Sequence, residues 1–157
     1  MDDEGFEALW RAQFQAVART ATAITGSSQD GAELAQEAFA RAYQHWRKVS
    51  QMERPDSWLH KVAANLAISQ QRRSRLGRGP SAERTVEGPE PPDEDLLTSL
   101  RALSPAQRAV ICLRFYLDWS VEDVAEALHK RPGTIRALTH QGMQRLRADL
   151  KKEPQDE

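Results

Sequence analysis

On both sides of a proline- and glycine-rich middle segment, apolar residues recur at steps of three and four. This is the spacing of one face of an α-helix. From Phe6 to Ile24 this spacing predicts a first helix, which Gly26 should end. The first half of the chain lacks the alternation of apolar and polar residues expected of a half-buried strand. The sequence therefore predicts an all-α protein, built as two small helical domains joined by a flexible acidic linker.

Two more helices are predicted in the first half. Asp30 and Glu33 resemble a capping box, which would open a second helix with its inner face between residues 34 and 46. This second helix should end before Pro55, because the residue before a proline disfavours the helical conformation. Asp56 or Ser57 then caps a third helix. Its predicted inner face consists of Trp58, Leu59, Val62 and Leu66, with Ala63 beside them.

The second half carries the clearer start signals. Ser104 is followed by a first-turn proline and by Gln107, the order of a capping box. Ser120 opens another helix, residues 130–133 predict a turn, and Thr134 caps a final helix. Two helices joined by a short turn, with bases on the outside of the second, are typical of a helix-turn-helix.

The final helix is predicted to present a DNA-binding face. Its outward positions alternate basic and amide side chains, where arginine can reach guanine or phosphate and glutamine can reach adenine. The same pattern would also suit the solvated face of an ordinary bundle helix. The outward row is Arg136, His140, Gln144 and Arg147, flanked by Ala137, Gln141 and Arg145.

Charge is segregated along the chain, although the total is only −1. Residues 11–76 contain ten basic and five acidic side chains, and residues 97–150 contain eight basic and five acidic side chains. Between them, residues 77–95 are rich in proline, glycine and acid, and such a segment buries too little apolar surface to offset its ordering entropy. We therefore predict domains at 1–76 and 96–152 with a flexible acidic linker, and the neutral total does not argue against nucleic acid.

Several function classes are excluded at this stage. No apolar run approaches the ~20 residues of a membrane span, and the acidic start MDDEGFEALW lacks the pattern of a secretory signal. The single cysteine rules out an internal disulfide, and the four histidines lack metal-ligand spacing. No phosphate-binding glycine loop or nucleophile elbow is present. We expect a cytoplasmic protein without membrane insertion, metal, cofactor or catalytic residues, and not an enzyme.

Four segments in order resemble the extracytoplasmic-function (ECF) sigma factors of the sigma-70 family. They are residues 32–43 (AELAQEAFARAY), 54–67 (RPDSWLHKVAANLA), 103–116 (LSPAQRAVICLRFY) and the helix-turn-helix of 120–150. The actinobacterial SigE-type branch is the most similar in character. The resemblance implies that the first domain is sigma region 2, a bundle of three or four helices, and the second is sigma region 4.

The resemblance also implies a function and partners. A sigma factor binds core RNA polymerase, directs it to minus-35 and minus-10 promoter elements and helps melt the DNA. The implied partners are the large-subunit clamp helices and flap region of the polymerase, and promoter DNA as duplex and melted single strand. Many family members also bind an anti-sigma factor, and this sequence neither shows nor excludes one. The implied polymerase contacts are Glu33, Gln36, Glu37 and Arg41. Glu33 and Glu37 could equally be charges that cap the helix and face solvent.

Two sets of DNA contacts follow from the same resemblance. Single-stranded bases bind in basic grooves and hydrogen-bonding pockets, and the implied minus-10 contacts are His60, Lys61, Asn65, Arg72 and Arg73. Asn65 could equally form a hydrogen bond within its own domain. The implied minus-35 contacts are Arg131, Thr134, Arg136, Ala137, His140, Gln141 and Arg145. Ala137 and Gln141 depart from the common family residues, so the base preference does not carry over.

A free-standing helix-turn-helix regulator, acting as a dimer on palindromic DNA, is the alternative function. It would account for residues 100–150 but leaves the first domain and the acidic linker without a role. The sequence leaves open whether the two domains pack together in the free protein.

Overall fold

The computed structural model describes residues 3–75 and 94–152, and within these ranges the regular structure is helical, without a strand. This confirms the all-α prediction. The predicted linker lies almost entirely outside the described residues, and α5 (Glu94–Arg101) begins at its last two positions.

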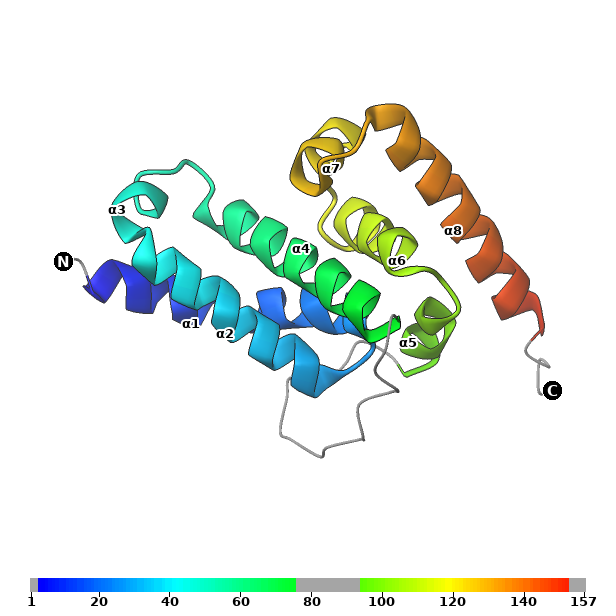
Figure 1. Cartoon of the computed structure of the whole chain (residues 1–157), viewed down its shortest axis with the longest axis horizontal. Coiled ribbons are helices and arrows are strands. Elements are labelled where there is room, and N and C mark those ends of the chain that lie inside the picture. The colour runs from blue at the N-terminus through cyan, green and yellow to red at the C-terminus, as the bar shows by residue number, and fades with distance from the viewer. Residues whose placement is uncertain (1–2, 76–93, 153–157) are drawn as a thin grey trace.

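The described helices form two groups. The first lobe comprises residues 3–75, and the second lobe comprises residues 94–152. Figure 1 shows the first lobe on the left and the second on the right, with α4 and α6 side by side where the lobes meet. The first lobe contains α1 (Asp3–Thr25), α2 (Ser28–Gln44), α3 (Trp46–Val49) and α4 (Pro55–Arg75). The second contains α5, α6 (Pro105–Ile111), the π-helical turn η1 (Cys112–Tyr116), α7 (Val121–Leu128) and α8 (Pro132–Lys152).

Helix starts in the first lobe lie earlier than predicted. The Ser27 side chain accepts a hydrogen bond from the Asp30 backbone N–H at 3.2 Å, so Ser27 is the cap of α2 and the predicted Asp30 cap is wrong. α4 begins at Pro55 itself, because the first-turn N–H that proline lacks would have no helical partner anyway. Gly26 ends α1 with φ +79°, as the sequence predicts.

Helix starts in the second lobe follow the sequence signals with one exception. Ser104 and Gln107 form the predicted capping box, and Ser120 accepts from the Asp123 N–H at 3.0 Å.

The exception is the turn predicted for residues 130–133. His129 adopts the left-handed conformation at φ 56°, so the chain reverses there and α8 already begins at Pro132. Thr134 therefore lies inside the first turn of α8 and is not its cap.

The first lobe encloses an aromatic core of its own. Phe39 is fully buried, and its ring lies 4.8 Å from Trp10 and 5.8 Å from Phe14, measured between ring centroids. Every residue of this core comes from the first lobe. These aromatic contacts fix α1 against α2 and leave the opposite face of α2 exposed.

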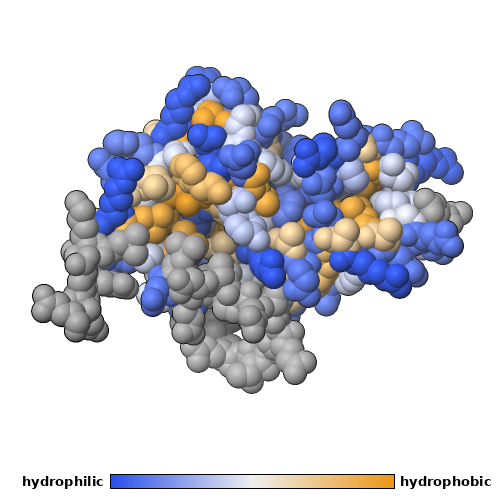
Figure 2. All heavy atoms as spheres, turned by 180° about the vertical axis from the view of Figure 1, so that it is seen from behind, coloured by the Kyte–Doolittle hydropathy of each residue, from blue (hydrophilic) through white to orange (hydrophobic). Residues whose placement is uncertain are grey.

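A second core is shared between the lobes. Ala64, Ala67 and Ile68 of α4 pack in one cluster with Val124 and Leu128 of α7. The two lobes are thus packed together, with the second lobe against α4 of the first. Figure 2 shows the molecule from behind, where apolar residues gather in separate patches on an otherwise hydrophilic surface. The lobe packing decides which predicted contact residues remain accessible.

Candidate nucleic-acid interface

The four predicted polymerase contacts form one exposed polar row on α2. Glu33, Gln36, Glu37 and Arg41 are all exposed, while the opposite face of the helix is buried in the first lobe. Arg41 Nε lies 3.2 Å from Glu37 Oε1, one turn earlier. Such exposed pairs add little to stability, so the row is free to contact another protein.

His60 is buried, and the structure contradicts its prediction as a charge for nucleic acid. Only 4% of its surface is exposed, and its Nδ1 lies 2.9 Å from the Thr20 hydroxyl of α1. Burial lowers the pKa of the imidazole to about 4, and the nearby Asp56 carboxylate only partly opposes this. At neutral pH the side chain is therefore uncharged and joins α4 to α1.

Asn65 and Lys61 lie on the side of α4 that faces the second lobe. Asn65 Nδ2 donates to the Lys61 carbonyl at 3.0 Å and to the Ala127 carbonyl of α7 at 2.8 Å. Lys61 is half-buried beside a groove between the lobes. Arg72 and Arg73, further along α4, are exposed. Apart from the buried His60, the predicted minus-10 set is thus divided into an accessible pair, Arg72 and Arg73, and a pair at the lobe boundary, Lys61 and Asn65.

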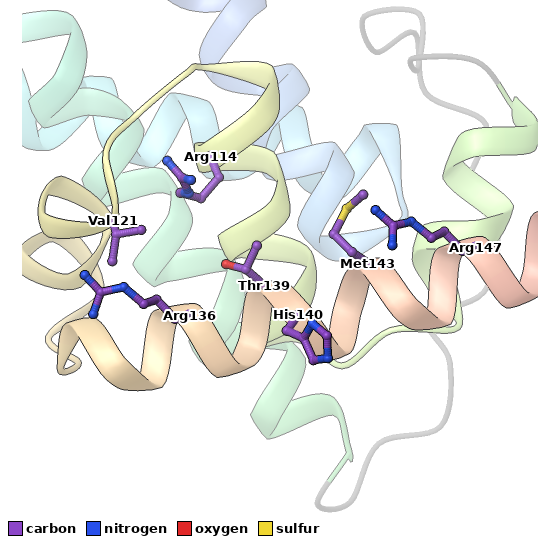
Figure 3. A pocket seen from close by; sticks show the side chains of 7 residues that line it. All are labelled: Arg114, Val121, Arg136, Thr139, His140, Met143 and Arg147. Atoms are coloured by element: carbon purple, nitrogen blue, oxygen red, sulfur yellow. The ribbon is translucent and has the colours of Figure 1, made fainter.

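All seven predicted minus-35 contacts are exposed at the start and on the outer faces of α8. They are Arg131, Thr134, Arg136, Ala137, His140, Gln141 and Arg145. Arg136 and His140 line an open hollow of about 280 Å³, together with Arg147, two turns beyond His140. Figure 3 shows these three side chains projecting from α8 along this hollow. Gln141 instead accepts from Gln107 Nε2 of α6 at 3.4 Å.

Arg114 of η1 lines the same hollow and is not among the contacts predicted from the sequence. Its Nη1 donates to the Trp119 carbonyl at 2.8 Å, which holds the guanidinium beside α8 (Figure 3). No signal in the sequence groups Arg114 with the outward row of the final helix. The backbone follows a π-helical turn there, with Leu117 N–H bonded to the Cys112 carbonyl, and this changes the direction of the side chains.

The hollow is positively charged, because arginines 114, 136 and 147 surround it. One acid lies close by: Glu122 Oε1 of α7 is 3.6 Å from Arg136 Nη2, with both side chains largely exposed. Three guanidinium groups on one open surface suit an anionic polymer, since phosphate accepts hydrogen bonds from arginine in a planar pair.

Residues 3–75 and 94–152 contain no group of three His, Cys, Asp or Glu side chains able to hold a metal ion. None of the helices in these ranges is long and apolar enough to cross a membrane.

Family models match both lobes. Residues 9–76 match the model for sigma-70 region 2, and residues 93–146 match that for sigma-70 region 4.

Individual relatives span the chain almost completely. The chain is 30% identical over 155 residues to the RNA polymerase sigma-E factor of Streptomyces coelicolor, covering 92% of this chain and 85% of the relative. It is 29% identical to the ECF RNA polymerase sigma factor SigL of Mycobacterium tuberculosis, covering 94% and 85%. The fold is similar to that of the sigma factor RpoE from Bartonella quintana, solved with the anti-sigma factor NepR. That match has a TM-score of 0.76 and 24% identity, and covers 98% of this chain and 99% of the other.

Proposed function

The chain belongs to the sigma-70 family as an ECF RNA polymerase sigma factor, which directs the polymerase to promoters, and we propose how its surfaces divide that task. The second lobe holds duplex DNA at the minus-35 element. The first lobe holds the polymerase and the melted minus-10 strand. The match of residues 9–76 to sigma-70 region 2 supports a role for the first lobe in this scheme. A free-standing helix-turn-helix regulator would give the first lobe no role.

The hollow beside α8 carries the proposal for the minus-35 element. Arg136 lies near the start of α8, where the second helix of a helix-turn-helix reaches base edges in the major groove. Arg114 comes from outside α8 and is half-buried, so it suits a phosphate at the edge of the groove. The remaining proposed contacts are Arg131, Thr134, Ala137, His140, Gln141 and Arg145.

Transcription by reconstituted polymerase tests this assignment. With core enzyme and a promoter located by mapping start sites, Arg136→Ala should weaken promoter binding by about 1–3 kcal/mol and relax the preference at one minus-35 position. Arg114→Ala should weaken binding to every sequence alike. It should also reduce the slope of the logarithm of the binding constant against the logarithm of salt concentration by about one, as expected for one lost phosphate contact. Arg11→Ala on exposed α1 is the control. Unchanged promoter binding by both variants would contradict the proposal.

The exposed row on α2 is proposed to bind core polymerase. Glu33, Gln36, Glu37 and Arg41 present alternating charge that a complementary surface on the clamp helices could match. Glu37→Lys should weaken co-purification with core polymerase at moderate salt, whereas Glu7→Lys on α1 should leave it unchanged. Equal retention of both variants would remove α2 from the interface.

The minus-10 strand is proposed to contact Lys61, Asn65, Arg72 and Arg73, without His60. The four side chains follow one another along α4, from the lobe boundary to the exposed end of the helix. Asn65 offers both an amide donor and an acceptor to a base edge.

RNA synthesis in this scheme is performed by the polymerase, so we assign the chain no catalytic residue, metal or cofactor and place its action in the cytoplasm. An anti-sigma protein is a further candidate partner, since the Bartonella sigma factor was solved with one.

A further inference from the structure

Glu122 is an acidic side chain beside the basic hollow of α8. It belongs to the first turn of α7, and its neighbour Val121 lines the hollow (Figure 3). Its Oε1 lies 3.6 Å from Nη2 of Arg136, and the side chains of Glu122 and Arg136 are 68% and 62% exposed. The pair is therefore open to solvent on the face where duplex DNA is proposed to bind.

The fold of α7 does not depend on this carboxylate. The cap of α7 is Ser120, whose side chain accepts from the Asp123 N–H at 3.0 Å. Buried apolar side chains, among them Val124 and Leu128, hold the helix in place. An ion pair between two exposed side chains adds little to stability. The contact between Glu122 and Arg136 therefore has no evident role in folding.

The same carboxylate opposes the attraction of DNA by the hollow. Arg114 and Arg147 line the hollow together with Arg136, and the three guanidinium groups attract phosphate. A carboxylate next to them repels phosphate at the same position, because both groups are negative. Binding to DNA of any sequence depends on such phosphate contacts. Glu122 should therefore weaken binding to every duplex, unless it also improves the contact with a particular base pair.

A guanine edge differs from a phosphate in charge. Guanine presents two neutral acceptors, N7 and O6, in the major groove, and one arginine side chain can donate to both. A guanidinium has five N–H donors, so Arg136 can donate to Glu122 and to guanine at the same time. A phosphate in place of the guanine would be repelled by the Glu122 carboxylate. The carboxylate therefore favours the neutral base over the charged backbone as the partner of Arg136.

The carboxylate also restricts the orientation of Arg136 before DNA is bound. Arg136 lies one turn after Pro132, the first residue of α8, and base contacts of a helix-turn-helix come from this part of the second helix. A long side chain that is ordered only on binding loses rotamer freedom at that moment. Contact with Glu122 removes part of this loss, because it limits the rotamers of Arg136 in the unbound chain.

We propose that Glu122 is a positioning residue of the minus-35 surface, which directs the Arg136 guanidinium to a guanine edge and away from phosphate. The inference rests on the proposed function, which assigns Arg136 to a base in the major groove. Glu122 acts through Arg136 and makes no base contact of its own. It increases the difference in affinity between the correct promoter and other DNA, and it lowers the affinity for DNA of other sequence.

Glu126 provides a matched control in the same helix. It lies one turn after Glu122 in α7 and is exposed, but it lines the groove between the lobes and not the hollow. Glu122→Gln and Glu126→Gln remove the same charge from the same helix with little change in size. Far-UV circular dichroism and thermal melts compare the folding of both variants with that of wild type.

Promoter binding is measured with the full chain and core polymerase at several salt concentrations. The DNA set contains the promoter located by mapping start sites, versions with single minus-35 base pairs replaced, and a duplex of random sequence. Glu122→Gln should reduce the preference at the base pair that Arg136→Ala identifies by about twofold to fivefold, the effect of one exposed ion pair. It should bind the random duplex tighter, and the slope of the logarithm of the binding constant against the logarithm of salt concentration should steepen by up to about one.

Glu126→Gln should keep the wild-type preference at every minus-35 position. In the Arg136→Ala background Glu122→Gln should not change the preference further, because the partner of the carboxylate is gone. Tighter binding of Glu122→Gln to every duplex with an unchanged preference would overturn the inference, since the carboxylate would then act on phosphate alone. A changed preference at a different base pair would also overturn it, since Glu122 would then accept directly from a cytosine amino group.

Arg136→Ala separates the inference from the proposed function. If Arg136→Ala leaves every minus-35 preference unchanged, the assignment of Arg136 to a base is wrong, and the positioning role of Glu122 fails with it. If Arg136→Ala removes one preference and Glu122→Gln keeps it in full, the proposed function stands and the positioning role of Glu122 is wrong.

Discussion

The two lobes bury their apolar surface in different ways. The first lobe has an aromatic core made only of its own residues, centred on Phe39. Both clusters that hold the second lobe's buried side chains also contain residues of α1 or α4. The first lobe is self-contained, whereas the second completes its core on the surface of the first. A destabilising substitution in the first lobe should therefore lower the stability of both lobes. A destabilising substitution in the second lobe should lower the stability of the second lobe alone.

Removal of the central aromatic ring should give the largest effect. Phe39→Ala deletes a fully buried ring that contacts Trp10 and Phe14, and we expect a loss of about 3–5 kcal/mol in unfolding free energy. Three of the four tryptophans lie in the first lobe, so fluorescence follows that lobe and far-UV circular dichroism follows both. In urea, both signals should shift together.

Ile135→Ala in α8 is the matched variant from the second lobe, also fully buried. Here the circular dichroism transition should begin at lower urea than the fluorescence transition, because the first lobe retains its own core. Coincident transitions in this variant would mean that the lobes fold as one unit, and the comparison would fail.

Acid should weaken the first lobe through His60. Its pKa is about 4 in the folded chain against an ordinary value near 6.5, so the unfolded chain binds the proton more tightly. Stability is therefore retained above pH 6.5 and falls as the pH drops toward 4, by about 3 kcal/mol in total. Urea unfolding followed by tryptophan fluorescence at several pH values measures this slope.

His60→Gln should remove most of that slope, at the cost of some stability at neutral pH. His45→Gln, at an exposed position, is the control and should keep it. An unchanged slope in His60→Gln would show that His60 binds its proton equally well in the folded and unfolded chains, which contradicts its burial as an uncharged side chain and would return it to the minus-10 set.

Helix spacing in the first lobe can be tested at a glycine. A Cβ at Gly31 would overlap Thr22 Oγ1 of α1 and lie 2.8 Å from the Ala18 carbonyl. Gly31→Ala should therefore cost about 1–3 kcal/mol, since backbone must move to relieve the contact. Gly133→Ala in α8 meets nothing within 4 Å and should be neutral or stabilising by up to about 1 kcal/mol. Thermal melts compare the two, and equal melting temperatures would contradict the close packing of α1 on α2.

The smallest expected effect is at the lobe boundary. Asn65→Ala removes the hydrogen bond to the Ala127 carbonyl and should cost about 1 kcal/mol. The loss should appear in the circular dichroism transition but barely in tryptophan fluorescence. Gln44→Ala, exposed at the end of α2, is the control. A fluorescence shift as large as the circular dichroism shift would place Asn65 within the first lobe's own fold.

Local signals in the sequence predicted the helices and most of the polar surfaces. The capping box at Ser104, the cap at Ser120 and the glycine end of α1 are short-range hydrogen bonding and backbone preferences, which need only neighbouring residues. The outward row of α8 followed from helical period alone, and all seven predicted minus-35 residues are exposed.

The burial of α4 was predicted less well, for a physical reason. Large apolar residues suggested an inner face through Val62 and Leu66, but these are only partly buried. Leu59 and Ala63 are fully buried as predicted, but so are Ala64 and Ala67, which were not predicted, because small side chains let neighbouring helices approach closely. Helical period gives the direction of a side chain, and size alone does not say which direction is enclosed.

The sequence by itself determined the helical class, the two lobes, the helix-turn-helix and the family resemblance, since each depends on patterns local to one segment. Only the tertiary structure decided that His60 is an uncharged link to α1, that Arg114 joins the α8 hollow and that Asn65 is bonded to the second lobe. Each of these three facts depends on contacts between separate elements or on a π-helical turn. Long-range contact sets solvent exposure, and exposure sets both charge and access to DNA.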